Sequence, residues 1–184
     1  MLKLSRKLVK PVPLFTTVVI ACIALLLAGC SSSSNKSSEF TSQDIMFAEM
    51  MIPHHEQAIV MSDLAISKTK NAEILKLAQE IKDAQNPEIE LMSSWEGVDA
   101  STHMGHTMMG MLSDEEIEEL KVASGSTFDR LFLEGMIKHH EGAIDMAGMI
   151  DNSSNPEVAK LGKNIISTQR AEIELMKQLL KALK

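Results

Sequence analysis

The amino-acid sequence predicts an all-α protein, a four-helix bundle made from two duplicated antiparallel helix hairpins. Three observations support this fold class. Four long segments have helical amphipathic periodicity, no segment shows the alternating pattern of a strand, and the second half of the chain repeats the first. Short connections within each helix pair and a longer one between the pairs are typical of two hairpins packed as a bundle.

The helices are predicted from their periodicity and their capping residues. Asn155 followed by Pro156 provides an N-cap amide and a proline at the first helical position. Ser113 and Glu116 form a capping box that opens a short helix between the two hairpins. Pro53 lies inside the first helix, where we expect a kink. The predicted helices cover residues 42–67, 72–95, 114–123, 126–150 and 156–183.

The internal repeat is clearest around two pairs of histidines. The stretch MMIPHHEQAIVM at residues 50–61 recurs as GMIKHHEGAIDM at residues 135–146. Residues 71–92 align in the same way with residues 155–176. The sequence therefore divides into repeat 1, a linker rich in methionine and histidine, and repeat 2. Within a domain of residues 41–184, these parts cover residues 43–95, 96–125 and 126–183.

The N-terminal residues have the pattern of an export signal. Positive charges precede an apolar run over residues 14–28, and LAGC at residues 27–30 resembles a bacterial lipobox. We expect cleavage after residue 29, lipidation of Cys30 and a serine-rich tether over residues 30–40. The alternative is an uncleaved transmembrane anchor, although the apolar run is shorter than a typical span of ~20 residues. In both cases the domain would lie in the cell envelope, outside the cytoplasm and attached to a membrane.

The composition limits the possible partners. Removal of residues 1–29 would change the formal net charge from −7 to −11, which does not suit binding to nucleic acid. After Cys30 the chain has no cysteine, which excludes a disulfide framework and a thiolate metal site. Methionine is abundant instead, with 14 in the chain against one Trp and no Tyr. A methionine-rich interior in a chain poor in aromatic residues also agrees with flexible core filling.

The two adjacent histidines of each repeat face different directions on their helix. At ~100° per residue, His55 falls in the middle of the apolar stripe and His54 on its flank. His140 and His139 inherit these positions in repeat 2. The facing helices carry an amide and an acid on their own apolar stripes, namely Gln85, Glu88, Gln169 and Glu172.

These buried polar groups need partners, because an unpaired buried polar group costs on the order of 1 to 3 kcal/mol. We expect His55 to pair with Glu88 or Gln85, and the equivalent residues of repeat 2, His140 with Glu172 or Gln169, to do the same. A core hydrogen-bond network of this kind is one complete explanation of His55 and His140. The neighbouring histidines are harder to explain in this way, because adjacent residues cannot share one core position.

Histidine and methionine together form a soft set of metal ligands. Met51 lies three and four positions before His54 and His55, close enough on a helix for one ion to be shared. Neutral imidazole and thioether suit copper, above all Cu(I), and suit Ca²⁺ and Mg²⁺ poorly. The predicted ligands in the two repeats are Met51, His54, His55, Met61, Met136, His139, His140 and Met146.

The linker stretch HMGHTMMGML at residues 103–112 is a second candidate metal site. Its candidate ligands are His103, Met104, His106, Met108, Met109 and Met111. A solvated loop gains little from several thioethers unless something binds them; the alternative is a loop that packs over the bundle. A site without thiols also suits copper outside the cytoplasm, where cysteine tends to oxidise.

The stretches FAEMMIPHHEQAIVMSDLA and FLEGMIKHHEGAIDMAGM, each followed by a helix ending in EIELM, resemble the domain of unknown function 305 family. The resemblance covers roughly residues 43–183. It implies a ferritin-like four-helix bundle that is usually exported, and some members of the family bind copper and protect against it. Gly135 and Lys138 depart from the family's MMI and proline, so the two half-sites differ.

Together these observations predict an extracytoplasmic, membrane-tethered protein that sequesters or transfers Cu(I), with Ag(I) as a mimic. It would be a binding protein and not an enzyme. Its partners would be the metal ion, a membrane through the N-terminal lipid, and a copper-delivery or efflux protein. One alternative is a di-iron or hemerythrin-like oxygen-handling bundle, although the Glu-x-x-His spacing of di-iron bundles is absent at these histidines. Another is a helical adaptor that binds no ion.

Overall fold

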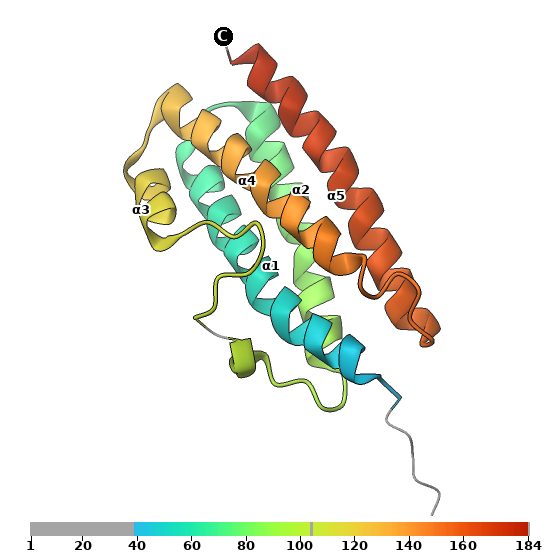
Figure 1. The fold of residues 1–184 in the computed structure, drawn as a ribbon. Coiled ribbons are helices and arrows are strands. Elements are labelled where there is room, and N and C mark those ends of the chain that lie inside the picture. The colour runs from blue at the N-terminus through green and yellow to red at the C-terminus, as the bar shows by residue number, and fades with distance from the viewer. Residues whose placement is uncertain (1–38, 104, 184) are drawn as a thin grey trace, which may run out of the picture. The chain divides into compact units, whose positions relative to one another are not determined.

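The computed structural model describes residues 39–103 and 105–183 (Figure 1). The predicted signal peptide, the lipidation site Cys30, most of the tether and Met104 lie outside these residues. Within the described ranges the chain is helical, and the prediction of an all-α bundle is confirmed. The elements are α1 (Ser42–Lys68), α2 (Ala72–Ser93), η1 (Ala100–His103), α3 (Asp114–Val122), α4 (Gly125–Ala147) and α5 (Pro156–Ala182). None of these helices is long and apolar enough to cross a membrane.

Helix starts follow the capping residues of the sequence. Asn71 and Asn155 each accept hydrogen bonds from two backbone amides of the helix that follows, and Ser113 forms the predicted capping box with Glu116. Pro53 lies within α1, which the structure assigns as one uninterrupted helix.

Two helices end earlier than the periodicity predicts. The helix α2 ends at Ser93, two residues before Trp95, whose indole ring stacks on Phe40 with ring centroids 5.0 Å apart. The helix α4 ends at Ala147, where Gly148 is the C-cap. The short 3-10 helix η1, which contacts α1, was not predicted from the sequence.

The two hairpins are α1 with α2 and α4 with α5 (Figure 1). The helices α1 and α4 run antiparallel, because contacts pair the start of one with the end of the other. Gln43 donates to the Met149 carbonyl at one end, and Thr69 donates to Asp129 at the other. Midway between these contacts the ring of His54 meets its own repeat counterpart His139. The two histidine motifs therefore lie at the centre of the bundle.

Two hydrophobic clusters occupy the two ends of the bundle. One contains Met61 and Met136 and the other contains Met51 and Met146. Each cluster thus combines the first methionine of one motif with the second methionine of the other, as expected for antiparallel copies. The buried histidines belong to neither cluster, which places polar side chains between the two apolar clusters.

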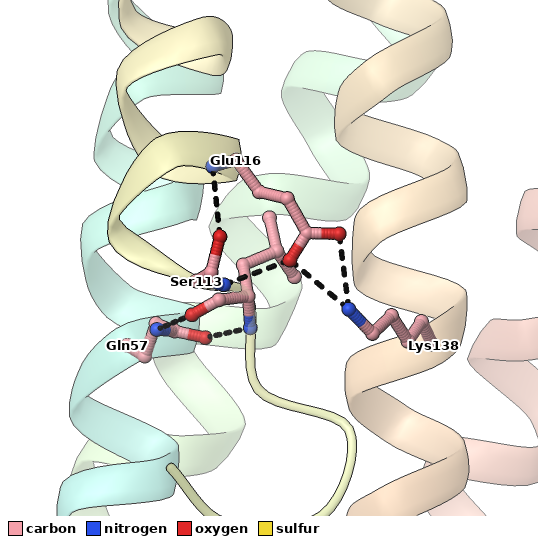
Figure 2. A network of polar contacts seen from close by, with 5 residues as sticks. Gln57, Ser113, Glu116 and Lys138 are labelled. Atoms are coloured by element: carbon pink, nitrogen blue, oxygen red, sulfur yellow. Dashed lines mark hydrogen bonds and ion pairs between the residues drawn. The ribbon is translucent and has the colours of Figure 1, made fainter.

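The end of the linker is fixed to both hairpins by the polar contacts shown in Figure 2. The side-chain amide of Gln57 in α1 donates to the Leu112 carbonyl at 3.0 Å and accepts from the Leu112 amide at 2.8 Å. Lys138 in α4 contacts both carboxylate oxygens of Glu116 at 3.0 Å. These contacts hold the residues just before α3 against α1 and α4.

Candidate metal centre

Four histidines are completely buried at the centre of the bundle, two from α1 and two from α4. Each donates a hydrogen bond through Nε2. His55 and His140 donate to the carboxylates of Glu88 at 2.9 Å and Glu172 at 2.7 Å. His54 donates to the backbone carbonyl of Met109, and His139 donates to the backbone carbonyl of His54, both at 3.0 Å. The expected pairing of His55 and His140 with an acid of the facing helix is therefore observed.

These hydrogen bonds determine which ring nitrogen is available for other chemistry. Carbonyl and carboxylate oxygens only accept, so the hydrogen lies on Nε2 and a neutral ring keeps its lone pair on Nδ1. All four Nδ1 atoms are buried without a hydrogen-bond partner among the described residues. Histidines that ligate metals almost always donate their other nitrogen to a carboxylate or a backbone carbonyl in this way. We call His54, His55, His139 and His140 the histidine quartet.

The quartet joins the two repeats. The rings of His54 and His139 lie with centroids 3.8 Å apart. The His54–His55 and His139–His140 centroids are 6.5 Å and 6.2 Å apart. The two motifs are thus not separate half-sites at opposite ends of the bundle, since one member of each pair is in ring contact with the other pair.

Burial keeps the central two histidines neutral. Burial, followed by the charge of His55, lowers the pKa of His54 to about 3. Burial, followed by the charge of His54, lowers the pKa of His139 well below its ordinary value. Because a metal ligand must be deprotonated, these two rings are ready to bind a cation at neutral pH without first losing a proton.

The linker explains why His54 is buried although the helical wheel places it on the flank of the apolar stripe. The backbone at Met109 and Gly110 passes directly over α4 at Gly142, where a Cβ atom would lie 2.8 Å from the Gly110 Cα and closer still to the Met109 carbonyl. Gly110 has a φ of +84° and itself lies against the Lys138 carbonyl. The linker therefore packs over the bundle here, and its Met109 carbonyl accepts the His54 hydrogen bond.

Gln57 and Gly142 occupy the same position of the two repeats, two residues after the second histidine. One position binds the linker with a side-chain amide and the other admits its backbone by having no side chain. This difference between the copies is visible in the aligned motifs, HHEQ against HHEG, and it is the signal that could have predicted where the linker crosses.

Gln85 and Gln169 do not make the hydrogen bonds considered for them. Both amides are buried, and neither finds a hydrogen-bond partner among the described residues. In residues 39–103 and 105–183, no group of three or more His, Cys, Asp or Glu side chains is arranged to hold a metal ion. A site built on the quartet would therefore need a donor of another type, and thioether sulfur is the soft donor that this chain supplies.

The methionines predicted as ligands separate into two groups. Met51, Met61 and Met136 are fully buried within the hydrophobic clusters. Met146 is also part of a hydrophobic cluster, but it lines an open surface pocket of 340 Å³ together with the linker residues His103, His106, Met108 and Met109. Met111 is not among the pocket residues, and its sulfur accepts a hydrogen bond from the Met108 amide.

Two further methionines line this pocket that the sequence did not single out, Met50 in α1 and Met149 just after α4. Met50 lies four positions before His54, which is the helical spacing for neighbours on one face. Its repeat counterpart is Gly135, so comparison of the two repeats hides it. Met149 lies outside the repeated motif and has no sequence signal of its own.

Comparison with known structures gives several similar proteins. CopM in its Cu(II)-bound form is 37% identical, with a TM-score of 0.67 over 77% of this chain and 97% of that one. CopM in its Cu(I)-bound form is 36% identical, with a TM-score of 0.64 over 76% and 96% of the two chains. A DUF305 protein from Streptomyces coelicolor, described as a candidate secreted protein, is 29% identical, with a TM-score of 0.71 over 77% and 94%.

No curated protein matches the chain. The family described as Domain of unknown function (DUF305) matches residues 44–180, a range that includes both histidine motifs and the linker between them. The chain therefore belongs to the DUF305 family.

Proposed function

We propose that this chain is an extracytoplasmic copper-binding protein that sequesters or transfers Cu(I) and does not catalyse a reaction. The observation that carries the proposal is the histidine quartet, with four buried Nδ1 atoms that lack a hydrogen-bond partner among the described residues. Similarity to CopM, known in copper-bound and silver-bound forms, supports a copper-related role.

The orientation of the quartet suits capture of an ion better than core packing alone. An unpartnered buried polar atom costs on the order of 1 to 3 kcal/mol, and a core network would be expected to satisfy both nitrogens of each ring. Here each ring is held by Nε2 and leaves Nδ1 free among the described residues. Met51 and Met136, fully buried three positions before His54 and His139, supply nearby thioethers of the kind that favours Cu(I).

The proposed location follows from the N-terminal sequence together with the similar Streptomyces protein described as a candidate for secretion. Lipidation at Cys30 would tether the domain to a membrane outside the cytoplasm. There it would be exposed to copper that has not yet entered the cytoplasm. A copper-delivery or efflux protein of the envelope is the partner that this position suggests.

A di-iron or hemerythrin-like function has less support. Such sites require several carboxylates and imidazoles around a common point, and the described residues contain no group of three or more arranged for an ion. Glu88 and Glu172, the acids next to the quartet, each contact the Nε2 of a histidine. A function as a helical adaptor would not explain why the four buried Nδ1 atoms lack a partner among the described residues.

The test is an anaerobic titration of the full chain, purified in detergent, with Cu(I) against a competing chelator. The His54→Gln/His139→Gln variant keeps an N–H donor for each carbonyl but removes both central Nδ1 atoms. We expect Cu(I) affinity to fall roughly ten-fold or more, which is about 1.4 kcal/mol.

Ser62→Ala is the matched control, because Ser62 is a buried polar residue of α1 without a hydrogen-bond partner among the described residues. Its Cu(I) affinity should equal that of the unmodified protein. Binding no tighter than about micromolar in the unmodified protein, or equal affinity after all four quartet histidines are replaced by glutamine, would refute the proposal.

A further inference from the structure

A second group of soft donors lies outside the histidine quartet, in the surface pocket of 340 Å³ between η1, the linker, α1 and the end of α4. Five methionines from α1, the linker and the end of α4 line it: Met50, Met108, Met109, Met146 and Met149. Thr107 and two imidazoles of the linker, His103 and His106, with ring centroids 6.0 Å apart, complete the lining. We call this the methionine pocket.

Core filling explains only part of the methionine pocket. Met108 and Met146 belong to a hydrophobic cluster, and Met50 and Met149 pack against it. The exposed side chains of the linker are not explained in this way. The Met109 side chain is 59% exposed and His106 is exposed as well, so neither contributes much buried apolar area. Glu49 lies near His103, with its Oε2 3.9 Å from the ring Nε2, and its Oε1 accepts a hydrogen bond from the Asp99 amide.

The donor type selects the ion. Thioether and imidazole favour a soft monovalent cation such as Cu(I) or Ag(I) over hard divalent ions. Within the described residues only one carboxylate, that of Glu49, lies close to either pocket imidazole, at 3.9 Å from His103 Nε2. A pocket of this chemistry would remain selective in a cell envelope where Ca²⁺ and Mg²⁺ are also present.

The methionine pocket is connected to the quartet through shared residues. Met109 lines the pocket with its side chain, while its carbonyl accepts the hydrogen bond of His54. Met50 is one helical turn before His54, and Met146 is two turns after His139 on the same face of α4. An ion in the pocket would thus lie next to the segments that carry the two central rings.

We propose that the methionine pocket is an outer capture site for a soft monovalent cation and that it supplies the ion to the histidine quartet. In the transfer, bonds from sulfur to the ion break as bonds from Nδ1 to the ion form, and the ion keeps its charge. The capture step is independent of the proposed function, whereas the supply step rests on it. Holding the ion close by raises its effective concentration at the inner site far above that of free ion in solution.

The test uses the full chain with methyl-labelled methionine and ring-labelled histidine, titrated with Ag(I) and followed by NMR. The Met50→Leu/Met149→Leu variant removes two pocket sulfurs and keeps apolar bulk. Met46→Leu/Met92→Leu is the matched control, since neither residue lines the pocket. Circular dichroism and thermal unfolding of both variants verify that the fold is retained.

In the unmodified protein and the control, pocket methyl signals should shift at substoichiometric Ag(I), before the quartet signals. The pocket variant should lose the outer equivalent of Ag(I) and load the quartet roughly ten-fold more slowly in rapid-mixing experiments, with the same final quartet affinity. Pocket methyls that do not respond to Ag(I) would overturn the capture site. Unchanged loading in the pocket variant would overturn the supply step.

The inner site and the outer site can be refuted independently of each other. The His54→Gln/His139→Gln variant should keep the shifts of the pocket methyls. If the pocket methyls respond in the unmodified protein while the quartet signals never do, the quartet is not the copper site of the proposed function and the outer site stands. If the quartet responds and the pocket does not, the inner site stands alone and the inference of capture is wrong.

Discussion

Replacing Gly142 by alanine tests whether the linker is held against the bundle as the structure indicates. An alanine Cβ at this position would lie 2.8 Å from the Gly110 Cα and would overlap the Met109 carbonyl. Backbone atoms cannot rotate away as the end of a side chain can. The linker must therefore lift from α4, and the Met109 carbonyl must then leave His54 Nε2, which it contacts at 3.0 Å.

Three effects contribute to the change in the free energy of unfolding of Gly142→Ala. Alanine in place of glycine inside a helix contributes about 1 kcal/mol of stability. Overpacking costs about 1 to 3 kcal/mol, and a buried His54 N–H without its acceptor costs a further ~1 to 3 kcal/mol. The unfavourable effects exceed the helix propensity, so Gly142→Ala should lower the free energy of unfolding by about 3 kcal/mol.

The matched control is Gly135→Ala, which lies two turns earlier in α4. Its Cβ would meet the ends of flexible side chains, with Leu112 Cδ2 nearest at 3.0 Å. The free energy of unfolding, measured by urea denaturation with linear extrapolation, should change little for this variant and strongly for Gly142→Ala. The proposed crossing of the linker over α4 is refuted if the two variants are equally stable or if Gly142→Ala is the more stable one.

Three further predictions concern stability without metal. The pKa of His54, lowered to about 3, and the lowered pKa of His139 mean that the unfolded chain binds more protons in acid. Urea unfolding should show full stability above about pH 6.5 and a loss near 2 kcal/mol for His54 at pH 5, with His139 adding to it; a flat profile would contradict this burial. Glu172→Ala should cost about 1 to 3 kcal/mol by leaving the His140 N–H unpaired, whereas Glu172→Gln, which keeps an acceptor, should cost clearly less in the same assay. Ser113→Ala should cost about 1 kcal/mol of unfolding free energy through loss of the helix cap. If it cost less than the removal of an exposed ion pair, the capping box would be contradicted.

Much of the fold follows from local signals in the sequence. The caps at Asn71, Ser113 and Asn155 bind the amides of their own helices, so the sequence around them contains both partners. The duplication also predicted the hairpin arrangement. Two apolar stripes that had to face each other predicted Glu88 or Gln85 as the partner of His55, and the structure has Glu88.

The surroundings of His54 could not be predicted in the same way. Its partner is the carbonyl of Met109, 55 residues later in the chain, and no periodicity within α1 contains information about a linker that crosses the neighbouring α4. The ends of α2 and α4 were also misplaced. Trp95 continues the apolar pattern of α2 but leaves the helix to stack on Phe40, a contact with a residue that precedes α1.

The unlike residues at the equivalent positions Gln57 and Gly142 have a consequence for symmetry. In a dimer of identical hairpins, any substitution would occur on both sides of the two-fold axis at once. A single covalent chain has no such restriction, and its one connecting segment can cross only one way. In a single chain, one copy can therefore have the Gln57 amide that binds the linker while the other has Gly142, which has no side chain. Two identical subunits could not have this asymmetry.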